Sequence, residues 1–276
     1  MRIAQRSVAA VAAVALLTAA VPATAAVGAW ASGVMAKVRL IAAGVGDDGR
    51  LSAAIEIALP PGWRTYWRNP GEAGIAPIID FSASSNLGPA DVRFPVPVRV
   101  DDGYTVTNVL EGRVVVPFSA MVPVPARPVA LAVSIDLGVC EVVCIPDRVE
   151  ATLLVLPGHD DPAAAAVLDV AHAALPGPPE PGVFFVEGVA RDGGTDERPA
   201  FRLALTAPAA AAAVMFVEGP QDWFAAAPAL ATADGDRASF IVIFDRTIAE
   251  TPIAGARFRV TVVAGGRAIE QSLDLD

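Results

Sequence analysis

The sequence predicts an all-β protein that consists of a β-sandwich followed by a second, smaller β domain. The first observation is that 24 prolines and 23 glycines are scattered between short apolar runs, as expected for many strands and turns rather than long helices. The second is composition, because 54% hydrophobic and 18% charged residues supply a folded core and exclude intrinsic disorder. The third is length, since 276 residues are enough for two domains.

Residues 1–26 show the three parts of a secretory signal peptide. Arg2 and Arg6 precede an apolar run over residues 8–17, and small residues follow at 23–26. The apolar run is shorter than the roughly 20 residues that a membrane-spanning helix needs, which disfavours an uncleaved anchor. We therefore expect cleavage near the end of this segment and a soluble periplasmic protein without stable membrane insertion.

Residues 27–157 are predicted to form the β-sandwich. Residues 37–43 and 51–59 read as two strands of a hairpin, joined by a turn rich in glycine and aspartate. This turn matches G-x-G-x-x-G, but the residues after it read as a strand, whereas a dinucleotide site requires a helix there. Further apolar runs lie at residues 92–94, 113–118, 129–137 and 149–156. The resulting seven or eight strands in about 120 residues are typical of a sandwich.

Residues 158–182 are predicted to join the two β units through a short helix and a Pro-rich linker. Asp161 can cap a helix with Pro162 at its first position, and an alanine-rich stretch continues to Leu175. The segment PGPPEPG at residues 176–182 then forms a stiff linker. Beyond it, the second β domain at residues 183–276 is predicted from apolar runs at 183–189, 201–205, 213–217, 239–244, 257–263 and 268–275.

The charge and the motifs exclude several classes of function. A formal net charge of -10 disfavours binding to nucleic acid or to anionic lipid, because both would repel an acidic protein. The sequence has no G-x-S-x-G elbow, no H-E-x-x-H and no P-loop, so hydrolase classes have no support.

The two cysteines, Cys140 and Cys144, form the strongest chemical signal. Their spacing can place them at the mouth of a tight β turn, where Cα separations of about 5.5 Å permit a disulfide. An exported protein is expected to form that bond. A structural staple is one interpretation, although closing so small a loop stabilises a fold by only about 2 kcal/mol. Neighbouring thiols also suit exchange chemistry, since one sulfur can resolve a mixed disulfide formed at the other. The spacing alone leaves both interpretations open.

Metal binding is the third interpretation of the cysteine pair. Two thiolates can hold Cu(I) or half of a zinc site, and a zinc site would need two further ligands. The only histidines, His159 and His172, lie on or near the predicted linker helix, and the four methionines are dispersed. We expect no metal and no other cofactor, and keep Cu(I) handling as an alternative.

Three motifs in order resemble the periplasmic N-terminal region of DsbD-type thiol:disulfide interchange proteins, in particular the ScsB-like branch. They are GWRTYWRNPG at residues 62–71, Gly103-Tyr104, and VCEVVCIP at residues 139–146. The later segments VEGPQDWF at 217–224 and GRAIE at 266–270 resemble the second N-terminal module of that branch. The resemblance implies an immunoglobulin-like sandwich over approximately residues 37–157, with Cys140 and Cys144 as its redox pair.

This resemblance implies a protein-disulfide reductase activity. Proteins of this family usually continue into a membrane domain and a thioredoxin-like domain, whereas this chain ends at Asp276. The expected partners are therefore periplasmic thiol and disulfide proteins, with a separate membrane reductase as the electron donor. A noncatalytic binding module with a structural disulfide is the alternative.

Aromatic residues of the resembling motifs are the candidates for shielding the sulfurs or binding a partner. Trp63, Tyr66 and Trp67 can form an apolar wall, with Tyr104 nearby, although core packing is an equally simple role for the tryptophans. Glu141 is expected to raise the thiol pKa values by like-charge repulsion. Any activation must then come from residues distant in sequence. For Arg64 and Arg68, a solvated strand face is an equally simple interpretation.

Overall fold

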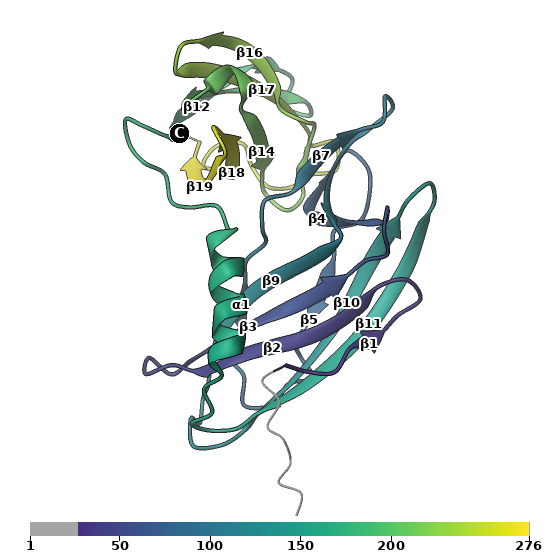
Figure 1. Cartoon of the computed structure of the whole chain (residues 1–276). Coiled ribbons are helices and arrows are strands. Elements are labelled where there is room, and N and C mark those ends of the chain that lie inside the picture. Colours follow the sequence, from purple (N-terminus) through teal and green to yellow (C-terminus); the bar gives the residue numbers. More distant parts are fainter. Residues whose placement is uncertain (1–26, 276) are drawn as a thin grey trace, which may run out of the picture.

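The computed structural model describes residues 27–275 and consists of β-strands with one short α-helix, which confirms the predicted all-β class (Figure 1). The predicted signal peptide, residues 1–26, lies outside the described residues. No helix within residues 27–275 is long and apolar enough to cross a membrane.

Within residues 27–275 the chain forms eleven strands, then one α-helix and then eight further strands. A short 3₁₀ turn lies among these last eight strands. The first group is β1 (Ala31–Ser32), β2 (Lys37–Val45), β3 (Arg50–Ala58), β4 (Arg64–Gly71), β5 (Ile78–Asp80), β6 (Ala90–Val92), β7 (Val98–Asp101), β8 (Val106–Glu111), β9 (Arg113–Met121), β10 (Val129–Cys140) and β11 (Cys144–Val155), followed by the helix α1 (Pro162–Ala173). The second group is β12 (Phe185–Gly194), β13 (Pro199–Thr206), η1 (Ala210–Ala212), β14 (Val214–Glu218), β15 (Phe224–Ala225), β16 (Ala229–Asp234), β17 (Arg237–Asp245), β18 (Arg257–Ala264) and β19 (Arg267–Asp274).

The first group forms an immunoglobulin-like sandwich of two antiparallel sheets, as the resemblance predicts. One sheet has the strand order β1-β2-β3-β9-β6 and the other β11-β10-β4-β8-β7, with β5 also paired to β10. Along β10 buried and partly exposed residues alternate, because successive side chains of a strand point to opposite faces. The buried Val, Leu and Ile residues of both sheets share one core with Trp67. Burial of each such aliphatic side chain stabilises the fold by roughly 1.5–3 kcal/mol.

The hairpin of β7 and β8 is not predicted by the apolar runs, because β8 buries a polar side chain. Asn108 of β8 is 6% exposed, and its amide donates a hydrogen bond to the backbone carbonyl of Asn69. This bond satisfies an N–H of the buried amide, whereas its Oδ1 has no hydrogen-bond partner among the described residues, and an apolar pattern reveals neither feature. The predicted run at 92–94 overlaps β6 only at Val92, where this strand ends.

The helix α1 begins as the sequence predicts. The Asp161 carboxylate accepts hydrogen bonds from the backbone N–H groups of Ala163 and Ala164, so it caps the helix N-terminus. Ala164, Leu168 and Ala171 are buried and share one face of the helix. This face packs against the sheet of β2, β3 and β9, and Figure 1 shows the helix crossing these strands.

The second β unit has a separate core. Two sheets, β12-β13-β17-β15 with β16 on β17, and β14-β18-β19, enclose a cluster of large aromatic side chains. Phe201, Trp223, Phe244 and Phe258 pack with ring centroids 5.2 to 6.2 Å apart. The sequence pattern does not predict β16, because every residue of this strand is exposed. Within the predicted linker, Gly177 already pairs with β19 through hydrogen bonds to Ala268 and Glu270.

The two β units contact each other through residues of β4 and β14. Phe216 of β14 packs against the sandwich core, with its ring centroid 5.6 Å from that of Trp67. Arg68 of β4 forms ion pairs with Glu218 and Glu270 of the second unit. The Arg68 side chain is only 15% exposed, so its interpretation as part of a solvated strand face is wrong. Its partners are distant in sequence, and a local pattern could not have indicated them.

Candidate functional site

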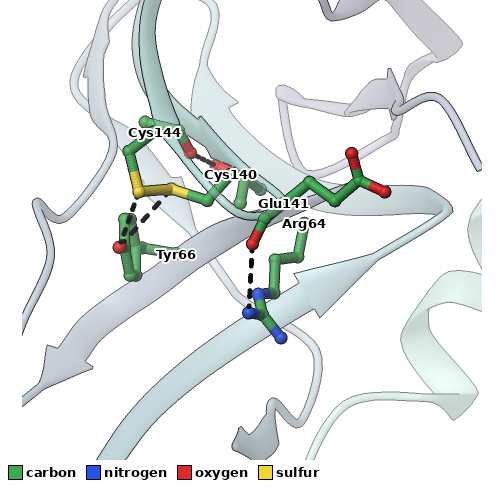
Figure 2. Close-up of a disulfide and its surroundings, with 7 residues drawn as sticks. Arg64, Tyr66, Cys140, Glu141 and Cys144 are labelled. Carbon is green, nitrogen blue, oxygen red and sulfur yellow. Dashed lines mark hydrogen bonds between the residues drawn. A yellow bond between two sulfur atoms is a disulfide. The ribbon is translucent and has the colours of Figure 1, made fainter. Parts of the chain in front are cut away.

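Cys140 and Cys144 form a disulfide at the tip of the β10–β11 hairpin. They are the last register pair of this ladder, their Cα atoms are 4.1 Å apart, and residues 141–143 make the turn (Figure 2). The turn is closed by a hydrogen bond from the Glu141 N–H to the Val143 carbonyl. The spacing argument is therefore correct in placing the cysteines at the mouth of a tight turn.

The two cysteines differ in exposure. Cys140 is 6% exposed and belongs to the buried residues of the sandwich, whereas Cys144 lies among the exposed residues of the hairpin tip. An incoming thiolate must reach a sulfur along the axis of the disulfide bond, so the exposed residue is the one open to attack. The Cys144 sulfur is therefore the accessible one of the pair, and the Cys140 sulfur is the protected one.

Tyr66 of β4 contacts both sulfurs. Its hydroxyl lies 3.3 Å from the Cys144 Sγ and 3.4 Å from the Cys140 Sγ, as the dashed lines in Figure 2 show. The pairing of β4 with β10 produces this contact, because Arg64 and Thr65 lie opposite Cys140 and Val139 in the register. Tyr66 follows directly, and its half-buried ring extends to the hairpin tip.

Two glycines leave the space in which the Tyr66 ring lies. A Cβ atom on Gly138 would lie 3.2 Å from two ring carbons, and one on Gly74 would lie within 2.5 Å of three. Gly74 also has a φ of 111°, a conformation that side-chain-bearing residues rarely adopt. The position of the hydroxyl over the disulfide therefore depends on two residues that carry no side chain.

Charged groups flank the turn on one side. The Arg64 guanidinium lies 3.5 Å from the Glu141 backbone carbonyl, and the Glu141 side chain points away from the disulfide in Figure 2. A basic residue thus lies beside the pair, although none is adjacent to it in sequence. The like-charge effect expected of Glu141 stays a prediction.

A groove of about 530 Å³ adjoins the disulfide. Cys144 and Tyr66 are among the residues that line it, and most of the remaining wall is apolar, with Ile75, Ile78 and Leu137 among its residues. Arg148 in the wall pairs with Asp136, so these two charges largely compensate each other. Beyond the groove the hairpin tip exposes Val142, which is 93% exposed. The groove beside the accessible cysteine is therefore mostly apolar, with charged groups at its wall and at the turn.

The other aromatic candidates lie elsewhere. Trp67 is fully buried, and its indole N–H donates to the Pro95 carbonyl, as expected for a core tryptophan. Trp63 is partly buried against the same core. Tyr104 is 95% exposed at the tip of the β7–β8 hairpin. Of the four aromatic candidates the structure thus brings Tyr66 into hydrogen-bond contact with the cysteines, and a shielding role of the other three stays a prediction.

The sequence reasoning missed Gly74, Gly138 and the groove residues. They come together only through the pairing of β10 with β4 and β5, which no spacing motif encodes. Among residues 27–275 no group of three or more His, Cys, Asp or Glu side chains is arranged to hold a metal ion.

Comparisons with known proteins agree with this geometry. A search of curated proteins returned no match. The crystal structure of the N-terminal periplasmic domain of ScsB from Proteus mirabilis superposes with a TM-score of 0.71, over 91% of this chain and 98% of that chain, at 24% sequence identity. The two proteins therefore share their fold across both β units. Residues 35–156 match the family model described as thiol:disulfide interchange protein DsbD, N-terminal. The resemblance predicted from the tryptophan and cysteine motifs is thus confirmed, and this segment carries the sequence signature of the N-terminal domain of DsbD-type interchange proteins.

Proposed function

We propose that the protein is a periplasmic thiol:disulfide exchange protein that passes reducing equivalents through Cys140 and Cys144 to or from partner proteins. One observation carries the proposal. The disulfide joins a buried sulfur to a cysteine exposed beside an apolar groove, which is the arrangement that stepwise exchange requires. The family match over residues 35–156 supports the same chemistry.

The reducing reaction starts from the dithiol form. The Cys144 thiolate attacks one sulfur of a partner disulfide, a bond forms between them, and the second partner sulfur leaves as a thiolate. The Cys140 thiolate then attacks the Cys144 sulfur, restores the Cys140–Cys144 disulfide and releases the first partner sulfur. Two electrons pass to the partner, whose two thiolates take up protons from water. A dithiol donor resets the pair by the reverse sequence.

The site favours exchange over a structural staple. The β10–β11 ladder pairs every residue from Val129 to Cys140, so the strands are joined by backbone hydrogen bonds along their whole length. A disulfide that closes a five-residue loop adds only about 2 kcal/mol to the stability of such a hairpin. Conformational stability therefore gives little reason for the bond, and its exposed position makes it reactive.

Partners and compartment follow from the same proposal. The structurally similar ScsB domain is described as periplasmic, which supports export of this chain through the signal peptide at residues 1–26. The partners are periplasmic thiol or disulfide proteins, and a separate membrane reductase supplies the electrons. Trp63 and Tyr104 keep their proposed role in shielding the site or binding a partner, whereas Trp67 lies in the sandwich core. The proposed division into units at residues 27–157, 158–182 and 183–276 assigns the reaction to the first.

The reduction potential of the Cys140/Cys144 pair tests the proposal. The purified mature protein is equilibrated with thiol buffers of known potential, and its free thiols are alkylated and counted. A potential above roughly -300 mV supports exchange with a periplasmic partner. A potential well below that value contradicts it and favours a binding module with a structural disulfide.

Single-cysteine variants test the two positions. Cys140→Ser keeps the exposed thiol without its resolving partner, so it should accumulate a stable mixed disulfide with oxidised glutathione. Cys144→Ser keeps only the buried thiol and should react at least about tenfold more slowly, because a mixed disulfide at a buried sulfur must displace its neighbours. Equal rates would contradict the assignment of Cys144 as the attacking thiol. Stoichiometric Cu(I) uptake by the reduced wild-type protein would support copper handling instead.

A further inference from the structure

The Tyr66 hydroxyl is the only side-chain group that hydrogen-bonds either sulfur in the described part of the chain. It lies nearly equidistant from the two, at 3.3 Å from the Cys144 Sγ and 3.4 Å from the Cys140 Sγ. A hydroxyl has one proton to donate, so it can serve only one sulfur at a time. A neutral disulfide sulfur is a weak acceptor, whereas a thiolate is charged and accepts a much stronger bond.

The two steps of exchange place negative charge on different sulfurs. When a donor thiolate attacks the Cys144 Sγ, the bond between the two cysteines breaks and Cys140 leaves as the thiolate. When the reduced protein attacks a partner disulfide, Cys144 is the thiolate. The hydroxyl reaches both positions from one place, because the sulfurs of the starting disulfide both lie within its hydrogen-bond distance.

The Tyr66 ring is held in this place by its surroundings. It lies between Gly74 and Gly138, where an added Cβ on either residue would press on ring carbons. Backbone pairing of β4 with β10 at Thr65 and Arg64 fixes its attachment point relative to Cys140. A donor positioned before the charge forms needs little reorganisation during the reaction, which makes it more effective than a mobile one.

We propose that Tyr66 is a catalytic hydrogen-bond donor, whose single hydroxyl stabilises the Cys140 thiolate in one step of exchange and the Cys144 thiolate in the other. The proposal rests on the proposed function and extends it beyond the shielding role expected of this residue. The O–H bond stays intact throughout, so no proton is transferred to sulfur by Tyr66, and the electron balance of exchange is unchanged. The thiolates take protons from water when the reaction ends.

Tyr66→Phe tests the proposal, because it removes the hydroxyl and keeps the ring between the two glycines. In the Cys140→Ser background the single Cys144 thiol is alkylated with iodoacetamide over a range of pH, and the midpoint of the rate profile gives its pKa. A lost charge-assisted hydrogen bond should move this midpoint up by about one pH unit. At pH 7 the thiolate fraction then falls about tenfold, while the higher basicity makes each thiolate about threefold more nucleophilic, so the rate falls about threefold.

The leaving-group step is measured separately in the protein with both cysteines. Reduction of the disulfide by dithiothreitol at constant thiolate concentration should be several-fold slower in Tyr66→Phe, since the Cys140 thiolate leaves without its donor. Thr65→Val is the matched control. It removes a neighbouring hydrogen bond from the Thr65 hydroxyl to the Gly138 carbonyl, 2.9 Å long, and contacts neither sulfur. Its alkylation midpoint should equal that of the parent.

An unchanged midpoint and an unchanged reduction rate in a folded Tyr66→Phe protein would overturn the proposal. Equal shifts in Tyr66→Phe and Thr65→Val would also overturn it, because they would indicate a general disturbance of the sheet. Failure of the proposed function looks different. In that case the wild-type disulfide itself would resist dithiothreitol and glutathione, whichever residue stands at position 66.

Discussion

Arg68 donates hydrogen bonds from its Nε and one terminal nitrogen to the Glu218 carboxylate, and so joins β4 of the sandwich to β14 of the second unit. Its guanidinium also pairs with Glu270 and lies 4.2 Å from the centre of the Trp67 ring. Burial would lower the pKa of Arg68, but the hydrogen bonds and charges of the two glutamates outweigh it and raise the pKa. The Arg68 guanidinium therefore stays charged at neutral pH.

Replacing the Arg68 cation should weaken the contact between the two β units and lower the free energy of unfolding. Arg68→Met leaves two partly buried carboxylates facing each other, and we expect a loss of about 2–4 kcal/mol in the free energy of unfolding. Urea denaturation followed by tryptophan fluorescence measures it. Arg237→Met is the control, since Arg237 is largely exposed and should change stability by less than about 0.5 kcal/mol. Similar small losses in both variants would mean that the ion pairs contribute little.

Phe216 provides the apolar part of the same contact. It extends from the second unit into the sandwich core beside Trp67, with 2% exposure. Phe216→Ala should cost about 3–5 kcal/mol, because it leaves a cavity between the units. Limited proteolysis should then cut the chain between residues 158 and 182 faster than in the wild-type protein. An unchanged cleavage rate would show that the units do not depend on this side chain for their association.

Asp147 of β11 holds the backbone of residues 34–36 through hydrogen bonds that we expect to weaken at acid pH. Its buried carboxylate accepts hydrogen bonds from the backbone N–H groups of Val34, Met35 and Ala36, at 2.7 to 2.8 Å. Burial alone would raise the pKa of Asp147, but the bonds from these backbone N–H groups outweigh burial and lower it. A lowered folded-state pKa contributes stability above the unfolded value of about 3.9, and this contribution is lost as pH falls through the folded value.

The Asp147→Asn variant measures this contribution. At pH 7 we expect it to be about 2–3 kcal/mol less stable than the wild-type protein, since three bonds to a charged acceptor are weakened. The difference should shrink as pH falls below the unfolded value of about 3.9 and through the lowered folded pKa, since the wild-type carboxylate then becomes protonated as well. Chemical denaturation at several pH values gives both numbers. A difference that stays constant with pH would refute the electrostatic origin.

Gly74→Ala tests whether the position of the Tyr66 ring depends on the missing side chain of Gly74. The added methyl group would lie within 2.5 Å of the ring, and the backbone φ of 111° is unfavourable for alanine, so the ring must move. We expect the alkylation midpoint of Cys144 to rise as in Tyr66→Phe, with a loss of stability of at least about 1 kcal/mol. Gly103→Ala is the control, because Gly103 also has a positive φ but no atom lies near its Cβ position. A shift in the control as well would implicate backbone strain alone.

The parts of the site that could be predicted are those encoded locally. Cys140 and Cys144 are close in sequence, so one turn brings them together and their spacing is sufficient to predict it. Tyr66 and Trp67 are neighbours on β4, and the alternation of a strand requires them to face opposite sides. The sequence does not show which of the two reaches the sulfurs, because that depends on the register of β4 against β10.

Long-range polar contacts could not be predicted for a related reason. Arg68 reads as a surface residue until the strands of the second unit place Glu218 and Glu270 beside it. The sequence offers no prediction for Asn108, because the partner of its amide N–H, the Asn69 carbonyl, lies on another strand. In each case a partner distant in sequence binds a donor group of the buried polar side chain.

The ladder between β10 and β11 has a consequence for the proposed thiol:disulfide exchange. Its pairs run without a break from Val129 and Val155 to the two cysteines, so opening the disulfide leaves the remaining pairs in place. The oxidised and reduced proteins should then have the same outline, so the proposed exchange needs no refolding. A partner that distinguishes the two forms must therefore recognise them at the hairpin tip itself, from two sulfur atoms and the hydroxyl beside them.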